Sequence, residues 1–185
     1  MKISIGIALF FLILGCTALA NATFTSTPSD GGYIVTDSAS GLSWYYVPTG
    51  SALTTGTFSQ ASSWASGLNA SQPGGLTGWS LASIAQLQAL YAAGGSSIAA
   101  FNFVDTSDHN TYNALTNAGV WASDSIPAYP TFPAGVFFSN GVALSEYGFT
   151  NLGELAVTSV PVPASLLLFA PGLGCLGFLR RRMKR

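Results

Sequence analysis

Every lysine and arginine of this chain lies in one of its two terminal segments, and this constrains how the stretch between them can fold. Residues 21–159 hold His109 as their one basic side chain, together with all 7 Asp and Glu residues of the 185-residue chain. Such a stretch cannot form a Lys or Arg salt bridge. We therefore expect its stability to come from burial of apolar side chains and from hydrogen bonds between neutral groups.

The same composition excludes several functions for residues 21–159. Nucleic-acid binding needs Lys or Arg side chains that displace counterions from phosphates, and this stretch has none. Binding of phosphorylated or carboxylated substrates is disfavoured for the same reason, because such substrates are usually held by Arg or Lys side chains. Both cysteines, Cys16 and Cys175, lie in the terminal segments, so thiol catalysis, cysteine-ligated zinc and disulfides are excluded as well.

The N-terminal segment has the three parts of a secretory signal peptide. One positive charge precedes an apolar run at residues 3–14, and Ala18 and Ala20 form the small-x-small pattern that signal peptidase cleaves. We predict that residues 1–20 are a signal peptide, cut after Ala20. Cleavage after Ala22 and lipidation of Cys16 through Ile-Leu-Gly-Cys are the alternatives.

The C-terminal segment has three parts of a different kind. Val160-Pro161-Val162-Pro163 should be extended and open to a processing enzyme, because each proline fixes its own φ and restricts the residue before it. Residues 164–179 carry no charge and would form a helix of about 24 Å, a short membrane span. A basic tail follows, which predicts a cytoplasmic C-terminus; it consists of Arg180, Arg181, Arg182, Lys184 and Arg185. The alternative is a buried core helix with a basic end.

This order of parts resembles the PEP-CTERM sorting signal of Gram-negative bacteria. Val160, Pro161, Val162 and Pro163 occupy the place of its motif, with Val162 where a Glu often stands. The resemblance implies that exosortase is a partner, and that the chain is held in the inner membrane by residues 160–185 before it reaches the cell surface or the extracellular matrix. It further implies a setting of biofilm and exopolysaccharide.

Residues 21–159 show short strands and capped helices in alternation. Residues 32–36 and 42–47 are rich in β-branched and aromatic side chains and flank a turn, which predicts a hairpin. Thr57-Phe-Ser-Gln60 and Ser83-Ile-Ala-Gln86 are capping boxes, each followed by apolar residues at helical spacing. A third, weaker helix is predicted from Asp108. Further strands are expected at residues 120–122, 135–138 and 155–158, and the sum indicates an α+β domain.

Four stretches of this domain, at residues 41–44, 78–90, 120–123 and 136–141, together resemble the DUF1566 family, which has a C-type-lectin-like fold. Gly41-Leu-Ser-Trp44 and residues 78–90 (Gly-Trp-Ser-Leu-Ala-Ser-Ile-Ala-Gln-Leu-Gln-Ala-Leu) are similar to its Thr-Gly-Leu-x-Trp and Asp-Trp-Arg-Leu-Pro-Thr signatures. Residues 120–123 and 136–141 take the places of two later aromatic segments. The resemblance implies a small lectin-like domain of short strands with two or three helices. Gly78, Ser80 and Ala82 replace the Asp, Arg and Pro of the family.

Few residues suggest chemistry. The cluster Asp105-Thr-Ser-Asp108-His109-Asn110 offers oxygen ligands for Ca²⁺, although Asp108 is equally suited to cap a helix. A serine hydrolase would need His109 as the base beside a serine, and the sequence has no Gly-x-Ser-x-Gly elbow. A glycosidase would need two paired carboxylates. The four tryptophans could stack on sugars, but their motif positions favour packing in the core; they are Trp44, Trp64, Trp79 and Trp121.

We assign no catalytic, cofactor-binding or metal-binding residue from the sequence. The expectation is a non-enzymatic exported protein with a role in binding carbohydrate or matrix. The alternative is a hydrolase that acts on polysaccharide and uses the same export route.

Overall fold

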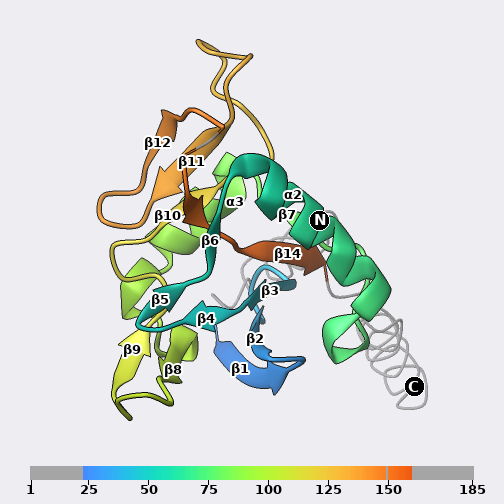
Figure 1. Cartoon of the computed structure of the whole chain (residues 1–185), viewed down its shortest axis with the longest axis vertical. Helices are drawn as coiled ribbons and strands as arrows, with labels where there is room; N and C mark the ends of the chain where they lie inside the picture. The colour runs from blue at the N-terminus through green and yellow to red at the C-terminus, as the bar shows by residue number, and fades with distance from the viewer. Residues whose placement is uncertain (1–22, 149, 160–185) are drawn as a thin grey trace, which may run out of the picture.

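Two five-stranded sheets form the framework of the domain (Figure 1). The structure, a computed structural model, describes residues 23–148 and 150–159. In spatial order the first sheet contains β1 (Phe24–Ser29), β2 (Gly32–Asp37), β3 (Leu42–Tyr46), β14 (Ala156–Ser159) and β7 (Ser80–Leu81). The second contains β12 (Val142–Ser145), β11 (Ala134–Phe137), β10 (Gly119–Trp121), β13 (Leu152–Gly153) and β6 (Thr55–Gly56). In both, neighbouring strands are antiparallel except β10 and β13, which are parallel.

The predicted hairpin is confirmed as β2 and β3, which pair from Tyr33 opposite Tyr46 to Asp37 opposite Leu42. Its turn is closed by the Asp37 carboxylate, which accepts hydrogen bonds from Ala39 N at 2.9 Å and Ser40 Oγ at 2.6 Å. Gly41 ends the turn at φ 68°, a left-handed conformation that glycine adopts without strain. Two small ribbons lie outside the sheets: β4 (Pro48–Thr49) with β5 (Ala52–Leu53), and β8 (Asn102–Val104) with β9 (Thr111–Asn113).

Both predicted helix starts are confirmed. Helix α2 (Phe58–Ser71) begins after Thr57, whose backbone amide donates to Gln60 Oε1 at 2.8 Å while its side chain accepts from Gln60 N. Helix α3 (Ile84–Ala92) begins after Ser83 with the same reciprocal pair to Gln86. Single 3-10 turns occur at η1 (Pro73–Gly75), η2 (Gly95–Ser97) and η3 (Ala99–Phe101).

The third helix predicted from Asp108 is wrong, because this stretch forms the β8–β9 ribbon. Asp108 Oδ1 accepts a hydrogen bond from Asn110 N at 2.9 Å. This bond closes a local turn, which competes with helix formation. His109 follows at φ 60°, which a right-handed helix does not contain. Thr111–Asn113 then pairs with Asn102–Val104 across the turn.

Strands β2, β3 and β14 of the first sheet are buried on both faces, because consecutive residues, whose side chains point to opposite sides, are buried in each of them. The edge strand β1 is mostly exposed. One row of paired residues, Ile34, Tyr45 and Ala156, packs towards α2. The next row, Val35, Trp44 and Val157, belongs to the larger core cluster with α3 and the second sheet. That cluster includes Leu87 and Leu90 of α3 and Val120 and Val136 of the second sheet. Phe101 of η3 and Leu155, between β13 and β14, also belong to it.

The chain crosses from one sheet to the other within residues 152–158, all of which are buried. Leu152–Gly153 lies between β10 and β6 in the second sheet, and Ala156–Ser159 lies between β3 and β7 in the first. Leu155 stands at the crossing and is fully buried. This segment therefore fixes how the two sheets are placed.

None of the helices in the described ranges is long and apolar enough to cross a membrane. The predicted span 164–179 lies outside the described residues. So do the signal peptide 1–20, the motif Val160–Pro163 and the basic tail 180–185.

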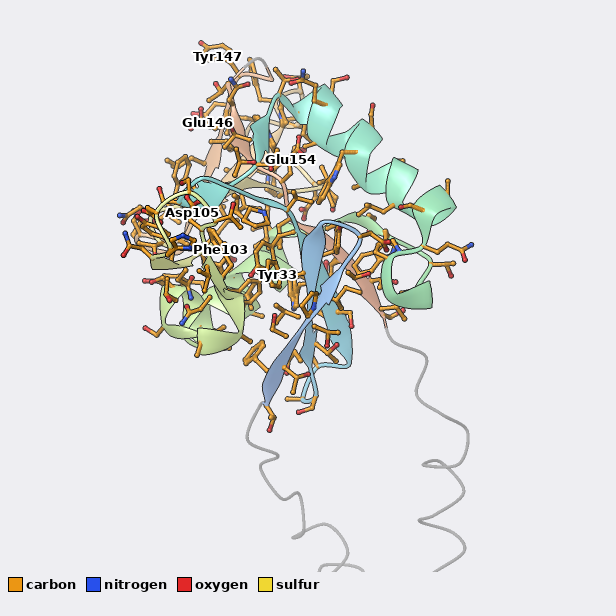
Figure 2. All side chains as sticks on the ribbon, turned by 60° about the horizontal axis from the view of Figure 1, so that its bottom comes forward. Tyr33, Phe103, Asp105, Glu146, Tyr147 and Glu154 are labelled. Carbon is orange, nitrogen blue, oxygen red and sulfur yellow. The ribbon has the colours of Figure 1, made fainter. Side chains whose placement is uncertain are left out.

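Glu154 is a carboxylic acid inside this buried segment, with a residue exposure of 6%. Its carboxylate lies against Gly56 so closely that a Cβ at position 56 would require the carboxylate to move. In Figure 2 Glu154 lies among the side chains of the domain, and Tyr147 lies at its upper edge in this view. Because no Lys or Arg lies between residues 23 and 159, no such charge offsets the burial, which raises the pKa of Glu154 above its ordinary 4.5.

Replacing Glu154 with Gln should reduce the loss of stability as the pH rises. A raised pKa means that the folded protein holds this proton more tightly than the unfolded chain does. The stability that protonated Glu154 contributes is therefore fully present below its pKa in the unfolded chain, 4.5. It is lost as the pH rises through the pKa of Glu154 in the folded protein. Melting temperatures measured from about pH 4 to about pH 7 should fall less in E154Q than in the wild type. Parallel curves for the two proteins would contradict this.

Candidate functional site

The polar cluster predicted from the sequence, Asp105 to Asn110, forms the β8–β9 turn. Asp105 Oδ1 accepts from Ser107 N at 2.8 Å, and Asp108 Oδ2 accepts from Tyr112 Oη at 2.6 Å. The hydrogen bonds from Tyr112 and then Asn110 lower the pKa of Asp108. The two carboxylates thus serve the turn itself. In residues 23–148 and 150–159, no three His, Cys, Asp or Glu side chains group together to hold a metal ion.

His109 lies in the same turn and borders none of the pockets described below. Its backbone amide donates to Asp105 O at 2.9 Å. Within the described part of the chain, no hydrogen bond joins its ring to a serine. The structure therefore does not assemble a serine–histidine pair around this residue.

The tryptophans pack in the core, as the sequence favoured. Trp44, Trp79 and Trp121 are at most 3% exposed. The Trp121 indole donates to Gly56 O at 2.7 Å, and that of Trp79 donates to Leu76 O at 3.0 Å. Trp64 on α2 is half-buried and stacks on Tyr45, with 6.0 Å between ring centroids. Three of the four tryptophans are therefore core residues, and Trp64 packs against the core from α2.

The exposed rings of the domain gather at a place that the sequence did not single out. Tyr129 and Phe132, in the loop between β10 and β11, are 58% and 41% exposed, and Tyr147, after β12, is 61% exposed. The Phe132 and Tyr147 rings meet edge to face, with 5.8 Å between centroids. Tyr129 and Phe132 lie between the prolines of a loop in which the sequence shows no strand or helix pattern. Aromatic residues in such a loop were the one indication in the sequence that these rings are exposed.

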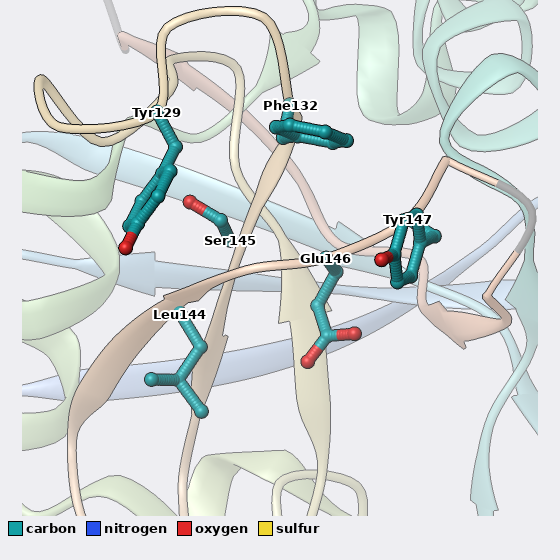
Figure 3. A pocket seen from close by; sticks show the side chains of 6 residues that line it. All are labelled: Tyr129, Phe132, Leu144, Ser145, Glu146 and Tyr147. Carbon is teal, nitrogen blue, oxygen red and sulfur yellow. The ribbon is translucent and has the colours of Figure 1, made fainter.

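These three rings line an open pocket of about 380 Å³, which we call the aromatic pocket. Leu144, Ser145 and Glu146 complete its lining. Figure 3 shows the two chain segments that form it, the β10–β11 loop and the end of β12 with the residues that follow. The Ser145 hydroxyl is buried in this lining and has no hydrogen-bond partner in the described structure. Glu146 is the one charged group that borders the space.

A second, more polar hollow of about 450 Å³ adjoins the aromatic pocket. Phe132 borders both spaces. Asp124 lines the second hollow together with Ser and Thr side chains: Ser59, Ser123, Ser125 and Thr131. The two hollows together offer apolar ring faces, hydroxyls and two carboxylates along one surface.

The first amide of each helix anchors one of the two segments that form the aromatic pocket. Ile84 N of α3 donates to Asp124 Oδ1 at 2.7 Å, which fastens the start of the β10–β11 loop. Phe58 N of α2 donates to Gly148 O at 3.1 Å, which fastens the segment after β12. These amides lack partners within their own helices, so the loops supply acceptors that the helices require.

Hydrogen bonds within the loops set the positions of the rings. Tyr129 N donates to Ile126 O at 2.8 Å, and Phe132 N donates to Tyr129 O at 3.1 Å. Glu146 N donates to Pro133 O at 2.9 Å and so ties the two segments to each other. The pocket is therefore formed by hydrogen-bonded turns that the two-sheet framework carries.

Comparison of the chain with protein-family models, with curated proteins and with solved structures found no match. The interpretation of the aromatic pocket accordingly rests on its own geometry.

Replacing Asp124 with Ala should destabilise the domain by about 1 kcal/mol, because the first amide of α3 loses its acceptor. The matched variant Asp124→Asn keeps an oxygen at the same position and should lose less. Urea unfolding of the two variants and the wild type measures this difference. Equal losses in D124A and D124N would show that the Ile84–Asp124 bond does not hold the loop.

Proposed function

We propose that this chain is an exported protein that binds polysaccharide through the aromatic pocket, after exosortase has sorted and cleaved it at its C-terminal signal. The observation that carries the binding proposal is the grouping of three exposed rings, Tyr129, Phe132 and Tyr147, around one pocket. Faces of exposed aromatic rings attract the C–H groups of sugar rings through their negative quadrupole.

The other groups in the pocket suit a ligand rich in hydroxyls. The Glu146 carboxylate can accept hydrogen bonds from sugar hydroxyls, and such charge-assisted bonds are stronger than neutral ones. The space of about 380 Å³ lies in the range of small-ligand sites. Its open shape and the adjoining second hollow suit an extended chain that enters and leaves, rather than an enclosed small molecule.

The pocket favours binding over hydrolysis. Glycoside cleavage uses two carboxyl groups that face each other across the scissile bond. Glu146 is the one carboxylate that lines the aromatic pocket, and the Asp124 carboxylate of the neighbouring hollow already accepts the amide of Ile84. We include a non-enzymatic role in the proposal for this reason.

A C-type-lectin-like fold is part of the proposal. Two short-stranded sheets with two helices, and a site formed by loops at one end, support the resemblance to the DUF1566 family. The last described strand, β14, ends at the exposed Ser159, directly before the proposed processing motif Val160–Pro163. Cleavage in that motif would leave every described strand in place.

Tyr147→Ala should weaken polysaccharide binding roughly tenfold, a loss of about 1.4 kcal/mol, because one stacking face disappears. Val104→Ala is the matched control, since Val104 is 54% exposed and lines neither hollow. Full-length protein in mild detergent would be applied to an array of neutral, cationic and anionic oligosaccharides. Equal binding by both variants would contradict the site, and the appearance of shortened chains would identify a hydrolase.

Deleting residues 160–185 should leave the domain folded but change where it accumulates. The test compares cell fractions of the full chain and the truncated chain in a bacterium that has an exosortase and in a strain without it. Intact mass of the mature protein should place one cut after Ala20 and another within Val160–Pro163. Unchanged fractionation and an uncut C-terminus in the exosortase strain would contradict the sorting proposal.

A further inference from the structure

We infer that the ligand of the aromatic pocket is a polysaccharide that carries free amino groups, such as a deacylated hexosamine polymer. This inference rests on the proposed polysaccharide-binding function and names the chemical class of its ligand. Three independent properties of the surface select for positive charge.

The first property is the set of ring faces. Tyr129, Phe132 and Tyr147 expose large parts of their side chains around one space. An ammonium group within about 6 Å of such a ring is attracted to its face, by about 0.5–1 kcal/mol at exposed sites. A neutral sugar gains only the stacking interaction with the rings.

The second property is the pair of carboxylates along the two hollows. Glu146 borders the aromatic pocket, and its carboxylate accepts no hydrogen bond from the described part of the protein. Asp124 uses Oδ1 for the amide of Ile84, which leaves Oδ2 for a ligand in the second hollow. A polymer that occupies both hollows therefore meets a carboxylate in each of them.

The third property is the absence of opposing charge. No Lys or Arg occurs between residues 23 and 159, so Glu146 and Asp124 have no such side chain of the domain to pair with. All 7 Asp and Glu residues of the chain lie in the same stretch, and their combined field repels uronate or sulfate groups while it attracts ammonium groups. An acidic polysaccharide would lose binding energy at the same site.

The test measures affinities of the full-length protein, in mild detergent, for β-1,4-linked hexamers of glucosamine, N-acetylglucosamine, glucose and mannuronate. The glucosamine hexamer should bind at least about fivefold tighter than its N-acetylated counterpart, which differs only in charge and acetyl groups. The preference should shrink as salt is raised.

Glu146→Gln should lower the affinity for the glucosamine hexamer more than the affinity for the neutral hexamers, so that the preference for glucosamine falls. Asp30→Asn is the matched control, because Asp30 is an exposed carboxylate in the β1–β2 turn and lines neither hollow. The control removes the same charge from the domain and should keep the preference. Equal loss in both variants would overturn the assignment to the pocket.

The outcomes separate the inference from the proposed function. Equal or tighter binding of the glucose or N-acetylglucosamine hexamer would overturn the inference and leave polysaccharide binding intact. A lysine hexapeptide that binds as tightly as the glucosamine hexamer would also overturn it, because the site would then recognise cations without sugars. Absence of binding to every hexamer would overturn the proposed function itself.

Discussion

The segment from Leu152 to Thr158 is the constraint on which the rest of the structure depends. It supplies an interior strand to the second sheet and, a few residues later, an interior strand to the first. All of its residues are buried, so neither sheet can move without exposing apolar surface or breaking strand hydrogen bonds. The ends of the second sheet, which hold the loops of the aromatic pocket, are therefore fixed relative to both helices.

The absence of Lys and Arg shapes both the stability and the site of this domain. Interior hydrogen bonds are made between neutral groups, as in the bond from the Trp121 indole to Gly56 O, and turns are closed by carboxylates such as Asp37. In the described residues, Trp44 Nε1 and Tyr46 Oη are buried without a hydrogen-bond partner. Carboxylates near the surface meet no internal ammonium or guanidinium group. Glu146 consequently remains available to a ligand, and the same composition that removes salt bridges from the fold gives the pocket its negative charge.

The site consists of loops on a rigid support, which is where binding residues commonly lie. Asp124 and Gly148 O give the first amides of α3 and α2 the acceptors that helix ends need, and in doing so they hold the two segments that carry the rings. Structural hydrogen bonds and ligand-binding side chains thus lie on the same short segments. This arrangement orders the rings of Phe132 and Tyr147 without burying them.

The sequence by itself determined the local elements. Reciprocal capping at Thr57 and Ser83 and the Asp37 turn act within a few residues, so their patterns predicted both helices and the first hairpin. The prediction of a third helix was wrong because the local hydrogen bonds of Asp108 and the pairing of residues 111–113 with β8 outweighed a weak helical spacing of apolar residues. Only the tertiary structure decided that Tyr129, Phe132, Glu146 and Tyr147 share one pocket, because periodicity reports which face of an element is apolar. Periodicity carries no information on which loops lie next to each other, because long-range strand pairing determines that arrangement.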